Sequence, residues 1–461
     1  MDSLSRQIAK YSLSLKFEDL PADVINEVKR FLYDSLGCAY GGYSTHDVRI
    51  VEELYADMAG KPEATVIGSG AKIPAYNATF LNSLMIRALD FNDIYWKQDP
   101  SHPSDILPVA LAVGERQRSS VQDVMVAMVL AYEFECRMCE FAVPGIRERK
   151  WHHATLTQFV SPIVAGYLMG LNEDQMVNAI GISGAHNLTL GAVTAGKLTM
   201  MKNTVDPLAA QSGVMAALMA EKGYTGTEQI FEGKEGLMQT FGPDWDEGKL
   251  VGNLGERFKI LGCSMKAFPT EALTHTHISA TLKVVIENDI KPEDIETVTV
   301  TTIARAVDIL FDPEKYRPTS RETADHSLPY CIAAAIVDRK ITTDQFNEDR
   351  IKDPQIATVL QKIKGEASEE FEKMFPAKQP SKVSIVLHDG RVFSAQLDFP
   401  KGDPREPMSD QDLENKFKGL SSHLLTDKKQ NQIREAIWNM ESFQTISEFM
   451  DLLKIDKDDG S

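Results

Sequence analysis

The stretch SVQDVMVAMVLAYEFECRMCEF, residues 120–141, decides the fold class of this chain. It is apolar on nearly every side at helical spacing, which is typical of a helix buried inside a large bundle. Similar patterns predict helices at residues 21–37, 75–89, 154–170, 174–185 and 204–222. The sequence therefore predicts a mainly α fold built on a large all-helical domain.

The pattern changes after about residue 265. Residues 296–303 alternate as a β-strand does, and two further alternating runs, 382–387 and 391–399, flank Asp389-Gly390. An Asp-Gly pair between such runs predicts a hairpin. From about residue 408 the pattern is helical again. We therefore expect a large helical domain made of residues 1–265 and 405–461, with a smaller α+β domain inserted at 266–404.

The net charge limits the partners. The chain of 461 residues carries 49 Lys and Arg against 67 Asp and Glu, a formal charge of −18. This excludes a general nucleic-acid binder and disfavours an anionic membrane surface. No segment reaches the roughly 18 apolar residues of a membrane span, and the first 20 residues lack a signal-peptide core. We expect a cytoplasmic protein, and at first sight the charge also disfavours an anionic substrate.

The five cysteines do not predict a disulfide framework, because they are few, odd in number and spread over a long chain. Cys136 and Cys139 have CxxC spacing but lie inside the predicted helix 120–141 without a turn. They are interpreted as two buried helix cysteines.

No phosphate-binding glycine loop, nucleophile elbow or zinc-protease motif is present, so no nucleotide cofactor or catalytic metal is expected. Polar residues in apolar surroundings remain. Asp90 and Asp93 follow a predicted helix at a spacing that would share one face, and acids there oppose the helix dipole, so other groups should hold them. His102 precedes Pro103, which suits a helix start.

Four further segments carry candidate residues. In KWHH (150–153), neighbours on a helix would not share a face, so at most one histidine should point into a given cleft. Lys202 begins an apolar helix, against its dipole. The remaining candidate histidines, lysine and tyrosine lie in two segments, Lys266 to His277 and Asp325 to Tyr330. Such a set suits acid–base chemistry without a cofactor on a substrate that bears carboxylates.

Six strings, in this order, resemble the MmgE/PrpD family: ALDFND (88–93), HPSD (102–105), KWHH (150–153), GYTGTEQIFEGKEG (223–236), FPTEALTH (268–275) and DHSLPY (325–330). The resemblance runs from about residue 5 to 450. It implies a large helical domain with a smaller α+β lid, a homodimer, and no metal or organic cofactor. The family comprises 2-methylcitrate dehydratases, cis-aconitate decarboxylases and an iminodisuccinate epimerase.

The resemblance also implies the site residues. By motif, the catalytic set carried over is Asp90, His102, His152, Lys202, His275 and Tyr330, with Lys197 as an alternative to Lys202. The residues expected to bind substrate are Asp93, Lys266 and His326. Either His102 or His152 would be the base, and Tyr330 or another histidine the acid.

The motifs fit neither main branch fully. Ile94 stands where the decarboxylases have Thr, and Asp105 is more like the dehydratases, whereas Ser101 departs from them. The leading hypothesis is a hydro-lyase that converts 2-methylcitrate, a small tricarboxylate, to 2-methyl-cis-aconitate. The alternatives are a decarboxylase that forms itaconate, an epimerase or isomerase of a related dicarboxylate, and an inactive carboxylate-binding protein. A local cluster of lysines and histidines would offset the overall negative charge.

Overall fold

The computed structural model describes residues 2–58, 60–195 and 198–456. Its backbone divides into two compact units. Unit 1 is made of residues 1–263 and 410–461, and unit 2 of residues 264–409. The sequence places the corresponding boundaries at 265/266 and 404/405.

Unit 1 is helical, which confirms the predicted fold class. Its helices are α1 (Leu4–Ser14), α2 (Ala22–Gly42), α3 (His46–Met58), α4 (Ala75–Arg87), α5 (Leu107–Gln117), α6 (Val121–Phe141), α7 (Ala154–Leu168), α8 (Glu173–Gly184), α9 (Met201–Glu221), α10 (Leu237–Thr240), α11 (Glu247–Val251), α19 (Asp410–Ser421), α20 (Asp427–Trp438) and α21 (Ile446–Asp451). Two small antiparallel pairs, β1 (Ala64–Thr65) with β2 (Lys72–Ile73) and β3 (Tyr95–Trp96) with β4 (Pro100–Ser101), complete it.

The centre of unit 1 is formed by α4, α6, α7 and α9, as the sequence pattern predicts. Helix α6 is buried along nearly its whole length, and its cysteines Cys136 and Cys139 are buried and free. Helices α7 and α9 approach closely at Gly213, where a Cβ would lie 2.3 Å from the Cβ of Ser161. A larger residue at Gly213 would therefore push the two helices apart.

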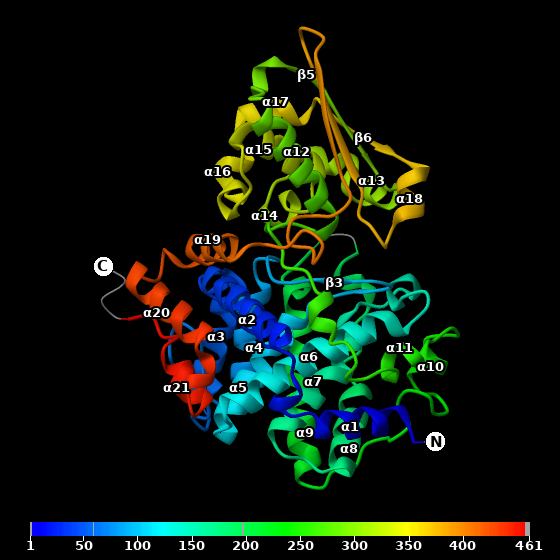
Figure 1. Cartoon of the computed structure of the whole chain (residues 1–461), viewed down its shortest axis with the longest axis vertical. Helices are drawn as coiled ribbons and strands as arrows, with labels where there is room; N and C mark the ends of the chain where they lie inside the picture. The colour runs from blue at the N-terminus through cyan, green and yellow to red at the C-terminus, as the bar shows by residue number, and fades with distance from the viewer. Residues whose placement is uncertain (1, 59, 196–197, 457–461) are drawn as a thin grey trace. The chain divides into compact units, whose positions relative to one another are not determined.

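The last part of the chain returns to the first. Helix α19 packs on α2, where Lys416 pairs with the buried Asp34 at 2.6 Å and Phe417 stacks on Tyr33 at 4.4 Å. Helix α21, red in Figure 1, packs on the cyan helix α5. The sequence predicts that the first of these partners, α2, ends at Gly37, which is wrong. The helix continues to Gly42, because Gly37 lies in its interior as the point of close approach to Phe417.

Unit 2 combines a mixed sheet with helices. The strands are β5 (Ile295–Thr302), β6 (Ile363–Ala367), β7 (Ser381–Leu387) and β8 (Val392–Leu397), in the order β6-β5-β7-β8. The β5–β6 pair is parallel and the other pairs are antiparallel. The helices are α12 (His275–Glu287), α13 (Ala304–Leu310), α14 (Arg321–Ala324), α15 (Leu328–Asp338), α16 (Glu348–Ile351), α17 (Pro354–Leu360) and α18 (Glu369–Met374).

Buried and more exposed residues alternate along β5 and β7 of unit 2, and the buried ones form one face of the sheet. Val298 and Val300 on β5 are buried and pair with the buried Ile385 and Val383 on β7. The hairpin predicted at Asp389-Gly390 is confirmed, since β7 and β8 pair on either side of it and Gly390 has φ of +84°. Helix α12 packs on β7 and β8. Within the described residues of both units, no helix is long and apolar enough to cross a membrane.

Candidate active site

A cluster of charged and titratable side chains is buried inside unit 1. Each member is at most 8 % exposed. We call it the buried polar cluster; its members are Arg87, Asp90, Asp93, His102, Asp105, Glu135, His152, His153, Lys202 and Asp206. They come from the end of α4, the loop after it, the 3-10 helix Pro103–Ile106, α6, the segment before α7, and α9.

Arg87 is the central cation of the cluster. Its Nη1 donates a hydrogen bond to Oδ1 of Asp90, and its Nε lies 3.6 Å from Asp105 and 3.8 Å from Asp206. Lys202 donates to Oδ2 of Asp90 at 2.9 Å. The sequence expectation that other groups hold Asp90 is therefore confirmed, and two cations do so.

The expectation that Asp90 and Asp93 share a helix face is wrong. Helix α4 ends at Arg87, and Asp90 has φ of +50°, which turns the chain out of helical geometry. Asp93 lies beyond this turn and accepts hydrogen bonds from the Ser104 hydroxyl at 2.6 Å and the Ser104 N–H at 3.1 Å. Burial raises the pKa of Asp93 to about 6, although hydrogen bonds from Ser104 and Tyr132 oppose the shift.

His102 caps the 3-10 helix that begins at Pro103, as the His-Pro pair predicts. Its Nδ1 lies 2.6 Å from the main-chain oxygen of Asp93. A carbonyl oxygen can only accept, so Nδ1 carries the proton. In the neutral ring the lone pair is therefore on Nε2.

His152 has the opposite tautomer. The main-chain N–H of Ala154 donates to its Nδ1 at 3.2 Å, so the proton of the neutral ring is on Nε2. Burial, and then the charge of His153, hold the pKa of His152 well below its usual value. His152 is therefore neutral at physiological pH, with an N–H to donate.

The expectation that at most one of His152 and His153 would point into a given region is wrong. The two residues precede α7 and are not helical neighbours, because Lys150 has φ of +71°. Their rings pack against each other at a tilt of 35° with centroids 3.9 Å apart, and the His153 ring lies 5.5 Å from that of His102. Both histidines are buried in the same cluster.

Asp206 faces these two histidines from α9. Its Oδ2 lies 3.4 Å from Nε2 of His153. Burial alone would raise the pKa of Asp206, but its interactions with His153 and Arg87 outweigh burial and lower this pKa below its usual range. Ligand atoms of His152, His153 and Asp206 lie within 4.8 Å of one another, a grouping that could also hold a metal ion.

Two further carboxyl groups hold protons. Burial raises the pKa of Glu135 to about 8, although Ser101 and Thr157 donate hydrogen bonds to it. Burial also raises the pKa of Asp105 well above its usual value, opposed by Arg87. Arg87 lies beside Asp90 and Asp206, and Lys202 pairs with Asp90, so these two cations offset part of the negative charge of the cluster.

In unit 2, Lys266 and His275 meet at one main-chain oxygen. Nζ of Lys266 donates to the carbonyl of Thr270 at 3.1 Å, and Nε2 of His275 lies 3.2 Å from the same oxygen. Phe268 packs on the His275 ring at 5.4 Å. Both predicted cations are buried. The structure thus brings together two of the four predicted residues in unit 2.

The other two predicted residues of unit 2 have other neighbours. The Tyr330 hydroxyl donates to the main-chain oxygen of Gln345, and its ring packs near Phe346 at 5.9 Å. Burial raises the pKa of Tyr330. His326 lies 2.5 Å from the carboxylate of Asp325. The catalytic role of Tyr330 and the binding role of His326 remain predictions.

Lys197, the alternative to Lys202, lies outside the described residues. The sequence reasoning missed Arg87, Asp105, Glu135, His153 and Asp206 as site residues. One signal could have found two of them: Glu135 and Asp206 are acids inside helices that are otherwise nearly apolar on all sides.

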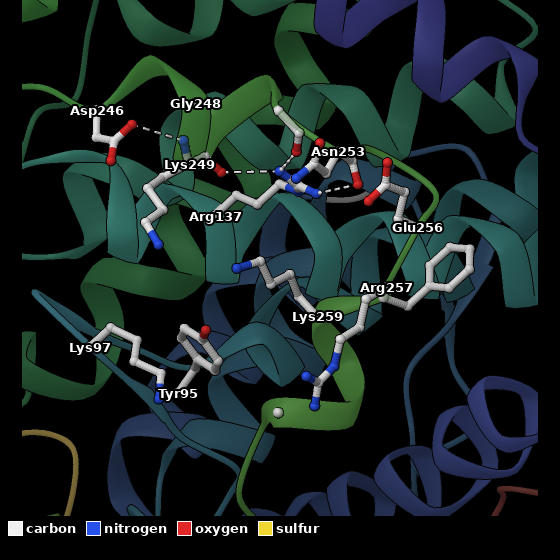
Figure 2. Close-up of a pocket in the computed structure, with 13 residues that line it drawn as sticks. Tyr95, Lys97, Arg137, Asp246, Gly248, Lys249, Asn253, Glu256, Arg257 and Lys259 are labelled. Carbon is white, nitrogen blue, oxygen red and sulfur yellow. Dashed lines mark hydrogen bonds between the residues drawn. The ribbon is translucent and has the colours of Figure 1, made fainter.

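Unit 1 also has an open pocket of ≈ 540 Å³. Figure 2 shows Lys249 and Lys259 extending between Arg137 on one side and Tyr95 and Lys97 on the other. The charged residues that line it are Lys97, Arg137, Lys249, Arg257, Lys259, Asp246 and Glu256. Arg137 is structural, because it binds Glu133 at 2.6 Å and carbonyls that follow α11, including Gly252 at 2.8 Å. No pattern in the sequence predicts this pocket.

Comparison with known proteins adds to this geometry. The model of the MmgE/PrpD N-terminal domain matches residues 6–247, and that of the MmgE/PrpD C-terminal domain matches residues 268–442. Cis-aconitate decarboxylase of Aspergillus terreus is 26 % identical over 98 % of this chain and 96 % of its own length. The Homo sapiens protein of the same name is also 26 % identical, over 98 % and 95 %. 2-Methylcitrate dehydratase of Salmonella typhi is 24 % identical over 91 % of each chain.

Proposed function

Because the chain belongs to the MmgE/PrpD family, we propose that it is a lyase that acts on a small tricarboxylate without a metal or organic cofactor. The observation that carries this proposal is the pair of opposite histidine tautomers in one buried cluster. His102 has its lone pair on Nε2, and His152 has its proton there. One site then has both a base and a hydrogen-bond donor.

The proposed roles follow from these tautomers. Nε2 of His102 takes a proton from the substrate carbon, and the imidazolium that results is the acid that returns this proton to the leaving group or to the carbanion. Burial keeps His152 neutral, so its Nε2–H donates a hydrogen bond to the negative charge that develops on the substrate. Tyr330, which the sequence also suggests as the acid, is a weaker candidate because its hydroxyl already donates to Gln345.

Cations would bind the carboxylates of the substrate. Lys202 lies in the cluster and is held by Asp90, so the proposed role of Asp90 is to position Lys202. Lys266 and His275 of unit 2 are the further cations proposed to bind substrate, together with His326, and Asp93 is proposed to contact it. A buried cation attracts a carboxylate more strongly than an exposed one, because water screens it less.

Two reactions are candidates. The sequence motifs favour dehydration of 2-methylcitrate, in which the base removes a C–H proton and the acid protonates the departing hydroxide. The relatives favour decarboxylation of cis-aconitate to itaconate, because the decarboxylases match 98 % of this chain at 25–26 % identity, whereas the dehydratases match 87–92 % at 23–24 %. In that reaction CO2 leaves and the acid protonates the carbon.

An NMR assay of the purified protein with 2-methylcitrate, cis-aconitate and related dicarboxylates tests the proposal. We expect turnover of one of the two tricarboxylates, and a fall of at least ~100-fold in His102→Ala. His186→Ala, at an exposed histidine outside the cluster, is the control and should keep its activity. Epimerisation of a dicarboxylate alone, or binding without turnover, would refute the lyase and support the alternatives.

The family also suggests a homodimer and a cytoplasmic location, and both remain part of the proposal. Sedimentation of the purified chain at several concentrations tests the first. A single species at the monomer mass of 51.2 kDa would contradict it.

A further inference from the structure

The pair formed by His153 and Asp206 has no part in the roles proposed above. His153 is 4 % exposed and Asp206 is 1 % exposed. Among the described residues, neither ring nitrogen of His153 and neither oxygen of Asp206 makes a well-formed hydrogen bond, apart from their mutual approach at 3.4 Å. Two buried groups that lack other partners carry a cost unless they compensate each other.

The His153 ring also contacts both proposed acid–base histidines. Its centroid lies 3.9 Å from that of His152, with the rings tilted by 35°, and 5.5 Å from that of His102, edge to face at 61°. A charge on His153 therefore acts on both of these rings at short range. Through Asp206, this charge is linked to Arg87 at 3.8 Å.

We infer that His153 and Asp206 form a positioning pair, in which Asp206 holds a protonated His153 against the rings of His102 and His152. The pair fixes the orientation of both rings and keeps a second proton off His152. This inference rests on the proposed function and deepens it, because it explains how His102 and His152 can hold different tautomers and how His152 stays neutral while its neighbour is charged.

The proposed proton on His153 follows from the burial of its partner Asp206. A buried carboxylate stays ionised only when a cation pairs with it, and the lowered pKa of Asp206 is caused in large part by His153. After burial, the charge of His153 is the largest cause of the lowered pKa of His152. A protonated His153 would also supply a positive charge near a bound tricarboxylate.

Other charged groups face this pair from every neighbouring segment. Those that bear on its titration are Arg87 from α4; Asp90 and Asp93 from the following loop; Asp99 near β4; His102 and Asp105 at the 3-10 helix; Glu135 from α6; Arg147 and His152 before α7; and Lys202 from α9. Burial raises the pKa values of Asp93, Asp99, Asp105 and Glu135, which reduces their negative charge at a given pH relative to acids in water. Asp206, at 3.4 Å, is the acid that pairs with His153.

A divalent cation bound by His152, His153 and Asp206 is the competing interpretation. Two contacts disfavour it. The Arg87 guanidinium lies 3.8 Å from Asp206 and would repel a second cation. The Nδ1 lone pair of His152 already accepts a hydrogen bond from the N–H of Ala154, so this nitrogen is not available to bind a metal ion. A proton on His153 compensates the charge of Asp206 and conflicts with neither contact.

NMR of the apoprotein labelled with 15N-histidine tests the inference independently of activity. In the wild type, one imidazolium should persist near pH 7 while His152 stays neutral. His153→Gln removes the charge, so the pKa of His152 should rise by about one unit or more. In an active enzyme, the acidic limb of the pH–rate profile should move to higher pH by the same amount.

Asp206→Asn provides the second variant. Without the carboxylate, His153 should lose its proton. His153→Gln should then change the pKa of His152 much less in the Asp206→Asn background than in the wild type. His186→Gln is the control and should shift nothing. Because these titrations need no substrate, they can succeed even if the protein acts on neither tricarboxylate.

Two results would overturn the inference. One is a His152 titration and a pH–rate profile that stay unchanged in His153→Gln. The other is one equivalent of zinc, iron or manganese in the purified wild type, measured by mass spectrometry, that both His153→Gln and Asp206→Asn lose. That second result would identify a metal site instead.

Discussion

The buried polar cluster and the open pocket of unit 1 both gather charges, but they balance them differently. In the pocket, Lys97 and Arg257 are exposed, and water can solvate them. In the cluster, Arg87 is 3 % exposed and three carboxyl groups lie within 4 Å of it. The comparison indicates that exposed charges such as Lys97 and Arg257 depend little on their neighbours, whereas the protonation states of the cluster depend on one another.

The largest expected effect is the loss of the central cation. Arg87→Met leaves Asp90, Asp105 and Asp206 with less compensation in a buried site. We expect the free energy of unfolding to fall by about 3–5 kcal/mol, as when one partner of a buried ion pair is removed. Chemical denaturation at neutral pH measures it.

The matched control removes a cation from the pocket. Arg257→Met should change the free energy of unfolding by less than about 0.5 kcal/mol, because the side chain is exposed. Equal losses in both variants would contradict the distinction between the two regions.

The second prediction concerns the proton on Glu135. Its raised pKa, about 8, means that the folded protein keeps a proton which the unfolded chain releases above about pH 4.5. The free energy of unfolding should therefore fall as pH rises from about 4.5 to 8. Glu135→Gln keeps an acceptor for Ser101 and Thr157 but removes the titration, so it should flatten this dependence by on the order of a few kcal/mol across the window.

Denaturation of both proteins at pH 5 and pH 8 measures this difference. Glu256→Gln, at the exposed edge of the pocket, is the matched control and should keep the wild-type pH dependence. If the stability of Glu135→Gln varied with pH as the wild type does, Glu135 would not hold a proton in the folded state.

The smallest effect is expected at the ion pair beside the pocket. Lys259 donates to Glu140 at 2.6 Å, and its side chain is 24 % exposed. Lys259→Met should lower the free energy of unfolding by about 0.5–1 kcal/mol, because Glu140 keeps the Tyr95 hydroxyl and Lys249 as partners. A loss near that of Arg87→Met would show that the pocket is as tightly coupled as the cluster.

Much of the local structure could be predicted from the sequence, because it depends on local patterns. The period of the apolar residues located α4, α6, α7 and α9, and the alternation around Asp389-Gly390 located the β7–β8 hairpin. The dipole argument required partners for Asp90, and Arg87 and Lys202 provide them. The end of α2 was misplaced, since a glycine that stops a helix and one that admits a neighbouring helix look alike in sequence.

The candidate site was predicted only in part, because its pairs join residues distant in the chain. His153 was set aside on the assumption of helical geometry, and the left-handed backbone of Lys150 invalidates that assumption. Asp206 lies 53 positions after His153, and nothing local links them. For Arg87 and Asp105, nearby partners exist, but their burial was not visible from the sequence.

The sequence by itself determined the mainly α class, the inserted β-containing segment and the residue types of an acid–base site, because these follow from periodicity and composition. Only the tertiary structure decided which groups carry charge. Burial raises the pKa values of Asp93, Asp105 and Glu135, while the nearby cations lower that of Asp206. Net charge is a sum over the whole chain, whereas protonation depends on the few groups that folding brings within several ångströms.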